Sequence, residues 1–187
     1  AILGSTGSGK STMMLLMQRL YDLKQGEILI GGVPIQNIQK KYLREHVGLI
    51  LQEPFLYSRT VRGNLAIART DAPESELYEA ASIACAHGFI QDFDRGYDTI
   101  VGERGVTLSG GQMQRVAIAR TLLKPNDILI FDDSLSAVDT ETDQLIREQL
   151  RRKNAGLTTF IISHRLTTLM GADLILVLKD GTIAQQG

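Results

Sequence analysis

The chain begins with a glycine-rich loop of a type that binds phosphate. Residues 4–11 match the pattern G-x-x-x-x-G-K-[ST], and the loop with its first helical residues consists of Gly4, Ser5, Thr6, Gly7, Ser8, Gly9, Lys10, Ser11 and Thr12. The glycines let several backbone N–H groups face one centre at the positive end of a helix. In such a loop Lys10 bridges the β- and γ-phosphates of a nucleotide, and the Ser11 hydroxyl is a ligand of Mg²⁺. The alternative is a flexible glycine turn.

Two adjacent acids form a second candidate. Asp132 and Asp133 follow an apolar run at 127–131 that predicts a buried strand. Ligands of a parallel sheet sit at the carboxyl ends of its strands, so Asp132 would hold Mg²⁺ through water and Asp133 would reach toward an attacking water. Acids also begin ordinary loops, so only the combination with the phosphate loop favours this interpretation.

A third candidate is the segment 108–112, Leu-Ser-Gly-Gly-Gln. Ser109 is a good helix N-cap, and Gly110 and Gly111 leave backbone N–H groups bare at a positive helix end. This predicts a second anion site, although the chain has one obvious nucleotide loop. We therefore expect the segment to serve the nucleotide of another copy. The alternative is an ordinary capped helix start.

The elements that must position these residues alternate between strands and helices. The predicted helices are 10–20, 74–85, 112–123 and 141–153, and the predicted strands are 27–30, 33–35, 47–51, 127–131, 158–162, 174–178 and 182–184. Cys85 is expected on the apolar side of its helix. The alternation predicts a mainly parallel α/β core with helices gathered in the middle third.

Composition excludes several classes of protein. The 187 residues suit one domain, and 20 Lys and Arg against 21 Asp and Glu give no attraction to nucleic acid. A lone Cys85 makes no internal disulfide, and no apolar run approaches the roughly 18 residues of a membrane helix. Only three residues precede Gly4, which predicts that the sequence is cut from a longer one.

Together the motifs resemble the nucleotide-binding domain of ATP-binding-cassette (ABC) transporters. The resemblance spans the chain and rests on 4–12, Gln52, 108–112, 128–133, 136–139 and His164. It implies a P-loop NTPase fold of the α/β class: a parallel-sheet core at about 1–53 and 125–187, an inserted helical signature subdomain at about 54–124, and short β-hairpins. The implied cofactors are ATP and Mg²⁺.

The resemblance also implies roles for single residues. Ser11, Gln52 and Asp132 would hold Mg²⁺, whereas Asp133, His164 and Gln52 would be catalytic. The signature residues Ser109, Gly110, Gly111 and Gln112 would contact the nucleotide of a second domain in a head-to-tail pair, and Asp139 would communicate across that dimer. Without the resemblance, His164 reads as a structural histidine.

Two segments resemble the exporter branch of the family. They are Gln52–Leu56 and Val101–Gly105, both of which would contact a transmembrane domain. This implies an ATP-driven motor on the cytoplasmic face of the cell membrane, exporting a drug or lipid-like substrate without a nucleic-acid partner. A DNA-acting ATPase of the superfamily would need a long coiled-coil insertion between residues 12 and 108, and the chain has no room for one.

One residue departs from the family pattern. Asp133 stands where hydrolytic sites of the family carry Glu, and its side chain is shorter by about 1.5 Å. Since a misplacement near 1 Å costs about 100-fold in rate, we expect slow hydrolysis here and a heterodimer partner with the competent Glu. The alternatives are a tolerated swap in a homodimer and a nucleotide-sensing module that binds ATP without useful hydrolysis.

Overall fold

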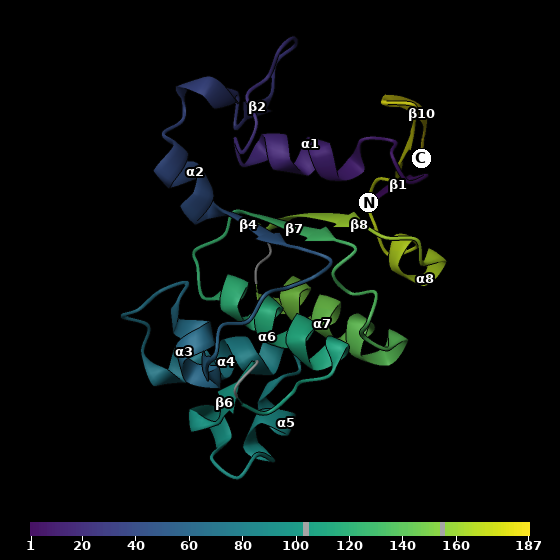
Figure 1. The fold of residues 1–187 in the computed structure, drawn as a ribbon. Helices are drawn as coiled ribbons and strands as arrows, with labels where there is room; N and C mark the ends of the chain where they lie inside the picture. The colour runs from purple at the N-terminus through teal and green to yellow at the C-terminus, as the bar shows by residue number, and fades with distance from the viewer. Residues whose placement is uncertain (103–104, 154–155) are drawn as a thin grey trace.

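A computed structural model describes residues 1–102, 105–153 and 156–187. A central sheet lies between two layers of helices, with α1 (Lys10–Met17) on one face and α6 (Gly110–Leu122) and α7 (Thr140–Lys153) on the other (Figure 1). Among the described residues, none of the helices combines the length and apolar character needed to span a bilayer.

The central sheet has six strands in the order β10-β9-β1-β8-β7-β4. They are β1 (Ile2–Gly4), β4 (Val47–Ile50), β7 (Ile128–Asp132), β8 (Thr158–Ile162), β9 (Leu176–Lys179) and β10 (Thr182–Gln186). All neighbouring pairs are parallel except β9 and β10. The predicted α/β class with a mainly parallel sheet is therefore confirmed. The carboxyl ends of β1, β7 and β8 meet at one edge, which gathers the loops that follow them.

The central strands are buried because helices cover both faces of the sheet. In β7, Leu129 and Ile130 are 0% exposed and Phe131 is 1% exposed, as expected for a near-continuous apolar run in a covered parallel sheet. One core joins Ile130 to Met14 and Met17 of α1, and a second core joins Leu129 and Phe131 to α6 and α7.

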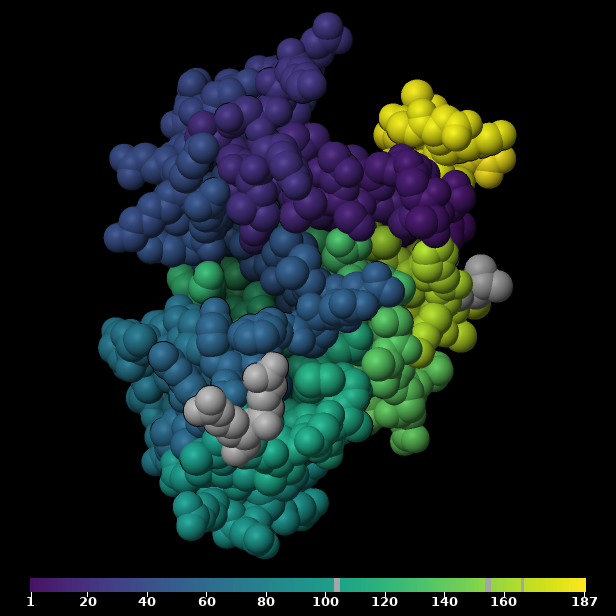
Figure 2. Space-filling view, viewed as in Figure 1, coloured from purple at the N-terminus to yellow at the C-terminus, as the bar shows by residue number. Residues whose placement is uncertain are grey.

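The remaining elements lie around the central sheet and the helices that cover it (Figure 1). Helices α3 (Val61–Ala66), α4 (Glu74–Ile83) and α5 (His87–Gln91) lie with α6 at the end opposite α1 (Figure 1), and this end is coloured blue to teal in the space-filling view of Figure 2. Smaller elements are β2 (Leu29–Ile30), β3 (Val33–Pro34), η1 (Ile35–Asn37), α2 (Lys40–His46), β5 (Arg59–Thr60), η2 (Gly96–Asp98), β6 (Ile100–Val101) and α8 (Leu166–Leu169). The two short hairpins, β2 with β3 and β5 with β6, are antiparallel.

The predicted helices have different bounds in the structure, and α1 ends at Met17 rather than at the expected residue 20. Helix α6 begins at Gly110, two residues before the expected start, because Ser109 caps it. The prediction that Cys85 lies within its helix is wrong: α4 ends at Ile83, and Cys85 adopts a left-handed backbone with a φ of 52°. The apolar spacing persists beyond the point where the backbone turns, so periodicity overestimates the length of this helix.

Candidate functional site

The glycine-rich loop joins β1 to the start of α1. Gly7 and Gly9 have φ angles of 82° and 98°, in the left-handed region that favours glycine. A Cβ at either position would meet nothing within 4 Å, so the requirement for glycine is one of backbone conformation rather than of space. The loop therefore wraps the N-terminus of α1, whose first N–H groups have no helical acceptor.

Lys10 lies over this loop. Its side chain is largely buried, and its Nζ donates to the carbonyls of Gly4 at 2.7 Å and Ser5 at 2.9 Å. These bonds use two of the three ammonium protons and leave the third for a ligand. Ser8 is 3% exposed, and its Oγ has no hydrogen-bond partner among the described residues. An anion in the loop would meet both groups.

Ser11 and Asp132 form a pair that suits a magnesium ion. The Ser11 hydroxyl donates to Asp132 Oδ1 at 2.9 Å, which joins the start of α1 to the end of β7. The described residues contain no group of three or more His, Cys, Asp and Glu side chains that could hold a metal ion by themselves. Mg²⁺ fits such a sparse site, because it is commonly bound by one or two carboxylates together with substrate phosphates and water.

Asp133 follows in a strained position. Its φ is 48°, and its backbone N–H donates to the carbonyl of Ile162 at 3.0 Å. Its own carbonyl accepts from the N–H of Ser136 at 3.1 Å. Asp tolerates the left-handed region better than most residues. Hydrogen bonds to the N–H and to the carbonyl of Asp133 therefore hold the start of the turn after β7.

The charges around Asp133 act in both directions on its carboxyl. Burial is the largest effect and raises its pKa above the ordinary value, and the charge of Asp132 adds to this. His164, Arg165 and Lys10 lower the pKa, but the net shift is upward. A carboxylate with a raised pKa is a stronger proton acceptor once ionised. His164 lies in the loop after β8 with an exposed side chain, near enough for its charge to act on Asp133.

The signature segment is a capped helix start. Ser109 Oγ accepts from the N–H of Gln112 at 3.2 Å, and Gln112 Oε1 accepts from the N–H of Ser109 at 2.9 Å. Gln112 therefore completes a capping box. Ser109 and Gly110 are exposed, and the N–H groups of Gly110 and Gly111 belong to the first turn. Within the described residues, no hydrogen bond joins the segment to the phosphate loop.

The two other predicted residues flank this region. Gln52 lies after β4 with an exposed side chain that has no hydrogen-bond partner among the described residues, while its carbonyl accepts from Gln114 Nε2 at 3.2 Å. Asp139 is exposed and precedes α7, where its Oδ1 accepts from the N–H of Thr142 at 2.9 Å. This N–H is the main cause that lowers the pKa of Asp139.

Sequence reasoning missed Gln114 and Arg165. Both side chains bond to the backbone of the turn between Asp133 and Asp139. Gln114 lies two residues beyond the signature and Arg165 directly follows His164, so proximity to a motif was the only signal available.

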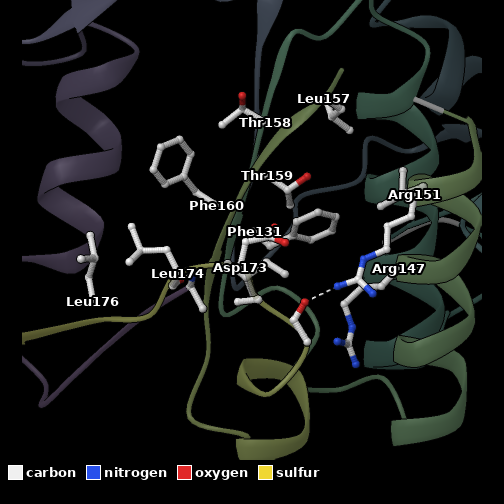
Figure 3. Close-up of a pocket in the computed structure, with 15 residues that line it drawn as sticks. Phe131, Arg147, Arg151, Leu157, Thr158, Thr159, Phe160, Asp173, Leu174 and Leu176 are labelled. Carbon is white, nitrogen blue, oxygen red and sulfur yellow. Dashed lines mark hydrogen bonds between the residues drawn. The ribbon is translucent and has the colours of Figure 1, made fainter. Parts of the chain in front are cut away.

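A separate cavity of about 490 Å³ lies away from these residues (Figure 3). Arg147 and Arg151 of α7 line one side, and Phe160, Leu174 and Leu176 lie across from them. Both arginines already have partners, since Arg147 pairs with Asp143 and Arg151 donates to the carbonyl of Gly171. The cavity therefore offers little for an anion, and the candidate site remains the edge of the sheet after β1, β7 and β8.

A mainly parallel sheet, a glycine-rich loop that leads from β1 into a helix, and a serine of that helix bonded to an aspartate at the carboxyl end of β7 define a P-loop NTPase. A model of the family described as "ABC transporter" matches residues 1–136. The chain belongs to this family and corresponds to its nucleotide-binding domain.

Curated relatives and a solved structure agree with this assignment. ABC transporter B family member 21 of Arabidopsis thaliana is 47% identical over 188 residues, covering 100% of this chain and 14% of the relative. ABC transporter B family member 4 of Dictyostelium discoideum is 48% identical over 187 residues, covering 100% of this chain and 24% of the relative.

The structure of a bacterial Atm1-family ABC exporter with ATP bound superimposes with a TM-score of 0.95 at 45% identity, covering 100% of this chain and 32% of that chain. The chain thus spans less than a third of the length of each of these proteins.

Proposed function

We propose that this chain is the ATP-binding and ATP-hydrolysing motor of an ABC exporter. The observation that carries the proposal is the joint arrangement of Lys10 over the loop and of Ser11 against Asp132 at 2.9 Å. These residues fit a nucleoside triphosphate with Mg²⁺, because they offer an ammonium proton, a hydroxyl and a carboxylate at one helix N-terminus.

In this proposal each residue has a defined task. Ser11, Asp132 and Gln52 would hold Mg²⁺, which would neutralise phosphate charge when bound. Lys10 donates its remaining proton to the β- and γ-phosphate oxygens. Asp133 accepts a proton from the attacking water, and His164 donates a hydrogen bond to the γ-phosphate and orients that water.

We propose further that hydrolysis at this site is slow. The carboxylate of Asp133 ends about 1.5 Å short of the place that Glu would reach, and an error near 1 Å in position costs about 100-fold in rate. Its left-handed backbone is held by hydrogen bonds at both its N–H and its carbonyl, which limits movement toward the water. A raised pKa improves its basicity but does not restore its reach.

A second nucleotide-binding domain is the proposed partner. Ser109 and Gly110 are exposed at the N-terminus of α6, a helix of 13 residues. In a head-to-tail pair, the N–H groups of Gly110 and Gly111 would bind the phosphates held by the partner's loop, with Ser109 and Gln112 fixing the helix start. Because Asp133 is poorly suited to hydrolysis, we propose a heterodimer whose other member carries Glu.

The transmembrane domain is the other proposed partner. Phe55, within the segment Gln52–Leu56, is 67% exposed, and Tyr57, directly after it, is 47% exposed. Aromatic side chains exposed together are typical of interaction surfaces. Of the second segment, Glu103 and Arg104 lie outside the described residues. We propose that the assembly acts at the cytoplasmic face of the membrane on a drug or lipid-like substrate. Within this chain, residues 1–53 and 125–187 form the proposed core and residues 54–124 the proposed helical subdomain.

A second candidate function is a nucleotide-sensing module that binds ATP and dimerises without useful hydrolysis. Asp133 is the observation that favours it. The two candidates differ in the turnover that remains once the catalytic acid of the partner is replaced: a motor with a slow site keeps slow hydrolysis by this chain, whereas a sensing module keeps none.

Comparison of ATP turnover in the complete transporter tests the proposal. The samples are the wild type, Asp133→Glu, and the wild type with the partner's catalytic acid replaced. We expect Asp133→Glu to raise turnover at this site and the partner's change to abolish most of the total. Normal turnover by the wild-type chain without a partner would refute the slow-site proposal.

The trans arrangement has its own test. Ser109→Arg places a long cation at the exposed helix start, so it should impair hydrolysis at the partner's site more than ATP binding by this chain. Equal loss of both activities would contradict the head-to-tail arrangement.

A further inference from the structure

The turn between Asp133 and Asp139 is held by two side chains from distant parts of the sequence. Its three anchored backbone groups are the carbonyl of Ser136, the N–H of Ala137 and the carbonyl of Val138. Gln114 Oε1 accepts from the Ala137 N–H at 3.1 Å. Arg165 Nη1 donates to the Val138 carbonyl at 2.7 Å, and its Nη2 donates to the Ser136 carbonyl at 2.7 Å. We call residues 136–138 the anchored turn.

Gln114 joins the anchored turn to the Gln52 segment. The side chain is 3% exposed, and both ends of its amide are used, because Nε2 donates to the Gln52 carbonyl at 3.2 Å while Oε1 accepts from Ala137. Only an amide side chain supplies a donor and an acceptor at this separation. A change in the backbone at Gln52 is therefore passed to Ala137 through one buried group.

Arg165 joins the anchored turn to the loop of His164. A planar guanidinium holds two carbonyls in a fixed geometry, which a lysine ammonium does not reproduce. The backbone N–H of Arg165 also donates to Ser163 Oγ at 3.1 Å, which stiffens the loop on the other side of His164. Since His164 is the immediate neighbour, a shift of its backbone moves the base of the Arg165 side chain.

The anchored turn is coupled at both of its ends to residues of the site. Ser136 N–H donates to the Asp133 carbonyl at 3.1 Å. At the other end, Asp139 caps α7 through its side chain and through its carbonyl, which accepts from the N–H of Asp143 at 2.9 Å. The turn therefore lies in the stretch of backbone that connects Asp133 to Asp139.

We propose, given the ATPase function proposed above, that Gln114 and Arg165 are positioning residues for hydrolysis. They set the anchored turn at a place defined jointly by the Gln52 segment and the His164 loop. Asp133 and Asp139 then keep a fixed relation to these two segments. Neither side chain needs to contact the nucleotide for this role, which acts through backbone position.

Two substitutions remove these bonds with little change of size or charge. Gln114→Met keeps the length of the side chain and removes both hydrogen bonds, and Arg165→Lys keeps the charge and removes the fork. Matched controls are Gln149→Met and Arg151→Lys, which make the same changes on α7 away from the turn. Turnover and equilibrium ATP binding are measured in the complete transporter with the partner's catalytic acid replaced, so that the assay reads hydrolysis at the site of this chain.

We expect kcat to fall about 10- to 100-fold in Gln114→Met and in Arg165→Lys, the range expected when catalytic groups are misplaced by up to about 1 Å. The KM for ATP and the binding affinity should stay within about 3-fold, since the phosphate loop is untouched, and the controls should match the wild type. The double variant should lose less than the product of the single losses, because both changes act on one turn. A loss of folded protein alone would lower the active fraction and the binding capacity together.

Three outcomes would overturn the inference: wild-type kcat in both variants, parallel losses of kcat and ATP binding, or multiplicative effects in the double variant. If the wild type hydrolyses ATP and both variants have the same kcat as the wild type, the inference is refuted and the proposed function stands.

A wild type without turnover refutes the function instead. Amide hydrogen exchange of residues 136–138 then decides the inference. ATP should slow exchange in the wild type and not in Gln114→Met. Equal slowing in both, or no slowing in either, counts against it.

Discussion

Gly111 packs so closely against the backbone of Ala137 that any added side-chain atom would displace one of them. A Cβ built at Gly111 lies 2.7 Å from the Ala137 carbonyl oxygen, whereas ordinary contact begins at 3.4 Å. A Cβ at the neighbouring Gly110 lies 3.4 Å from the Ala137 Cβ and fits without movement. Gly110→Ala and Gly111→Ala are therefore a matched pair that differ in this contact.

The two substitutions should change stability in opposite directions. Both gain up to about 1 kcal/mol from replacing glycine by alanine in a helix. Gly111→Ala also forces a shift of more than half an ångström in α6 or in the anchored turn, and overpacking of this kind costs about 1 to 3 kcal/mol. At about 2 to 4 °C per kcal/mol for a chain of this size, Gly111→Ala should unfold several degrees below Gly110→Ala.

Thermal unfolding of the two variants, followed by fluorescence or circular dichroism, measures this difference directly. Hydrogen exchange at residues 136–138 supplies the local control, because only Gly111→Ala should change it. If Gly111→Ala unfolds at the same temperature as Gly110→Ala or above it, the close packing of α6 on Ala137 is refuted.

Three further outcomes are expected. Lys10→Met removes a charge-assisted hydrogen bond to phosphate, worth about 1.5 to 3 kcal/mol, so ATP affinity measured by equilibrium binding should fall about 10- to 100-fold; unchanged affinity would place the phosphates elsewhere. Ser109→Ala removes the cap of α6 and should lower the free energy of unfolding by about 1 kcal/mol, and a chemical denaturation curve that matches the wild type would contradict this. Because the folded-state pKa of Asp133 is raised, its favourable contribution is present below the ordinary pKa and is lost as pH rises through the folded pKa. Asp133→Asn should therefore gain stability relative to the wild type as pH rises from below the ordinary pKa through the folded-state pKa, and a difference that stays constant with pH would refute the raised pKa.

The edge of the sheet could be predicted from the sequence because covalent order determines it. In a parallel sheet the residues that follow each strand lie at the same edge. Strand order alone therefore predicts that three groups lie near one another: the loop after Gly4, the acids Asp132 and Asp133, and His164 after β8. The capped start of α6 was equally local, since Ser109 bonds a backbone group three residues ahead.

The anchored turn could not be predicted in this way. Gln114 reaches Ala137 across 23 residues and Gln52 across 62, and Arg165 reaches Ser136 across 29. The partners in all of these bonds are backbone groups, which every residue carries, so residue types hold no trace of the pairing. The tertiary packing of α6, which carries Gln114, and of the loop after β8, which carries Arg165, selects which carbonyls and N–H groups meet the two side chains.

The backbone at Asp133 changes how its replacement of Glu should be understood. A shorter carboxylate alone would reduce reach, yet Asp133 also occupies a left-handed conformation between two hydrogen-bonded backbone groups. Asp is more tolerant of this region than Glu, because its short side chain bonds locally. Asp133→Glu therefore lengthens the side chain and strains the turn together, and any relief of that strain moves Ser136 through its bond to the Asp133 carbonyl. Since Arg165 holds the Ser136 carbonyl at 2.7 Å, the turnover gained by Asp133→Glu should depend on Arg165. The gain in turnover from Asp133→Glu should be smaller in a chain that also carries Arg165→Lys. An equal gain with and without Arg165→Lys would show that the reach of the carboxylate acts independently of the position of the turn.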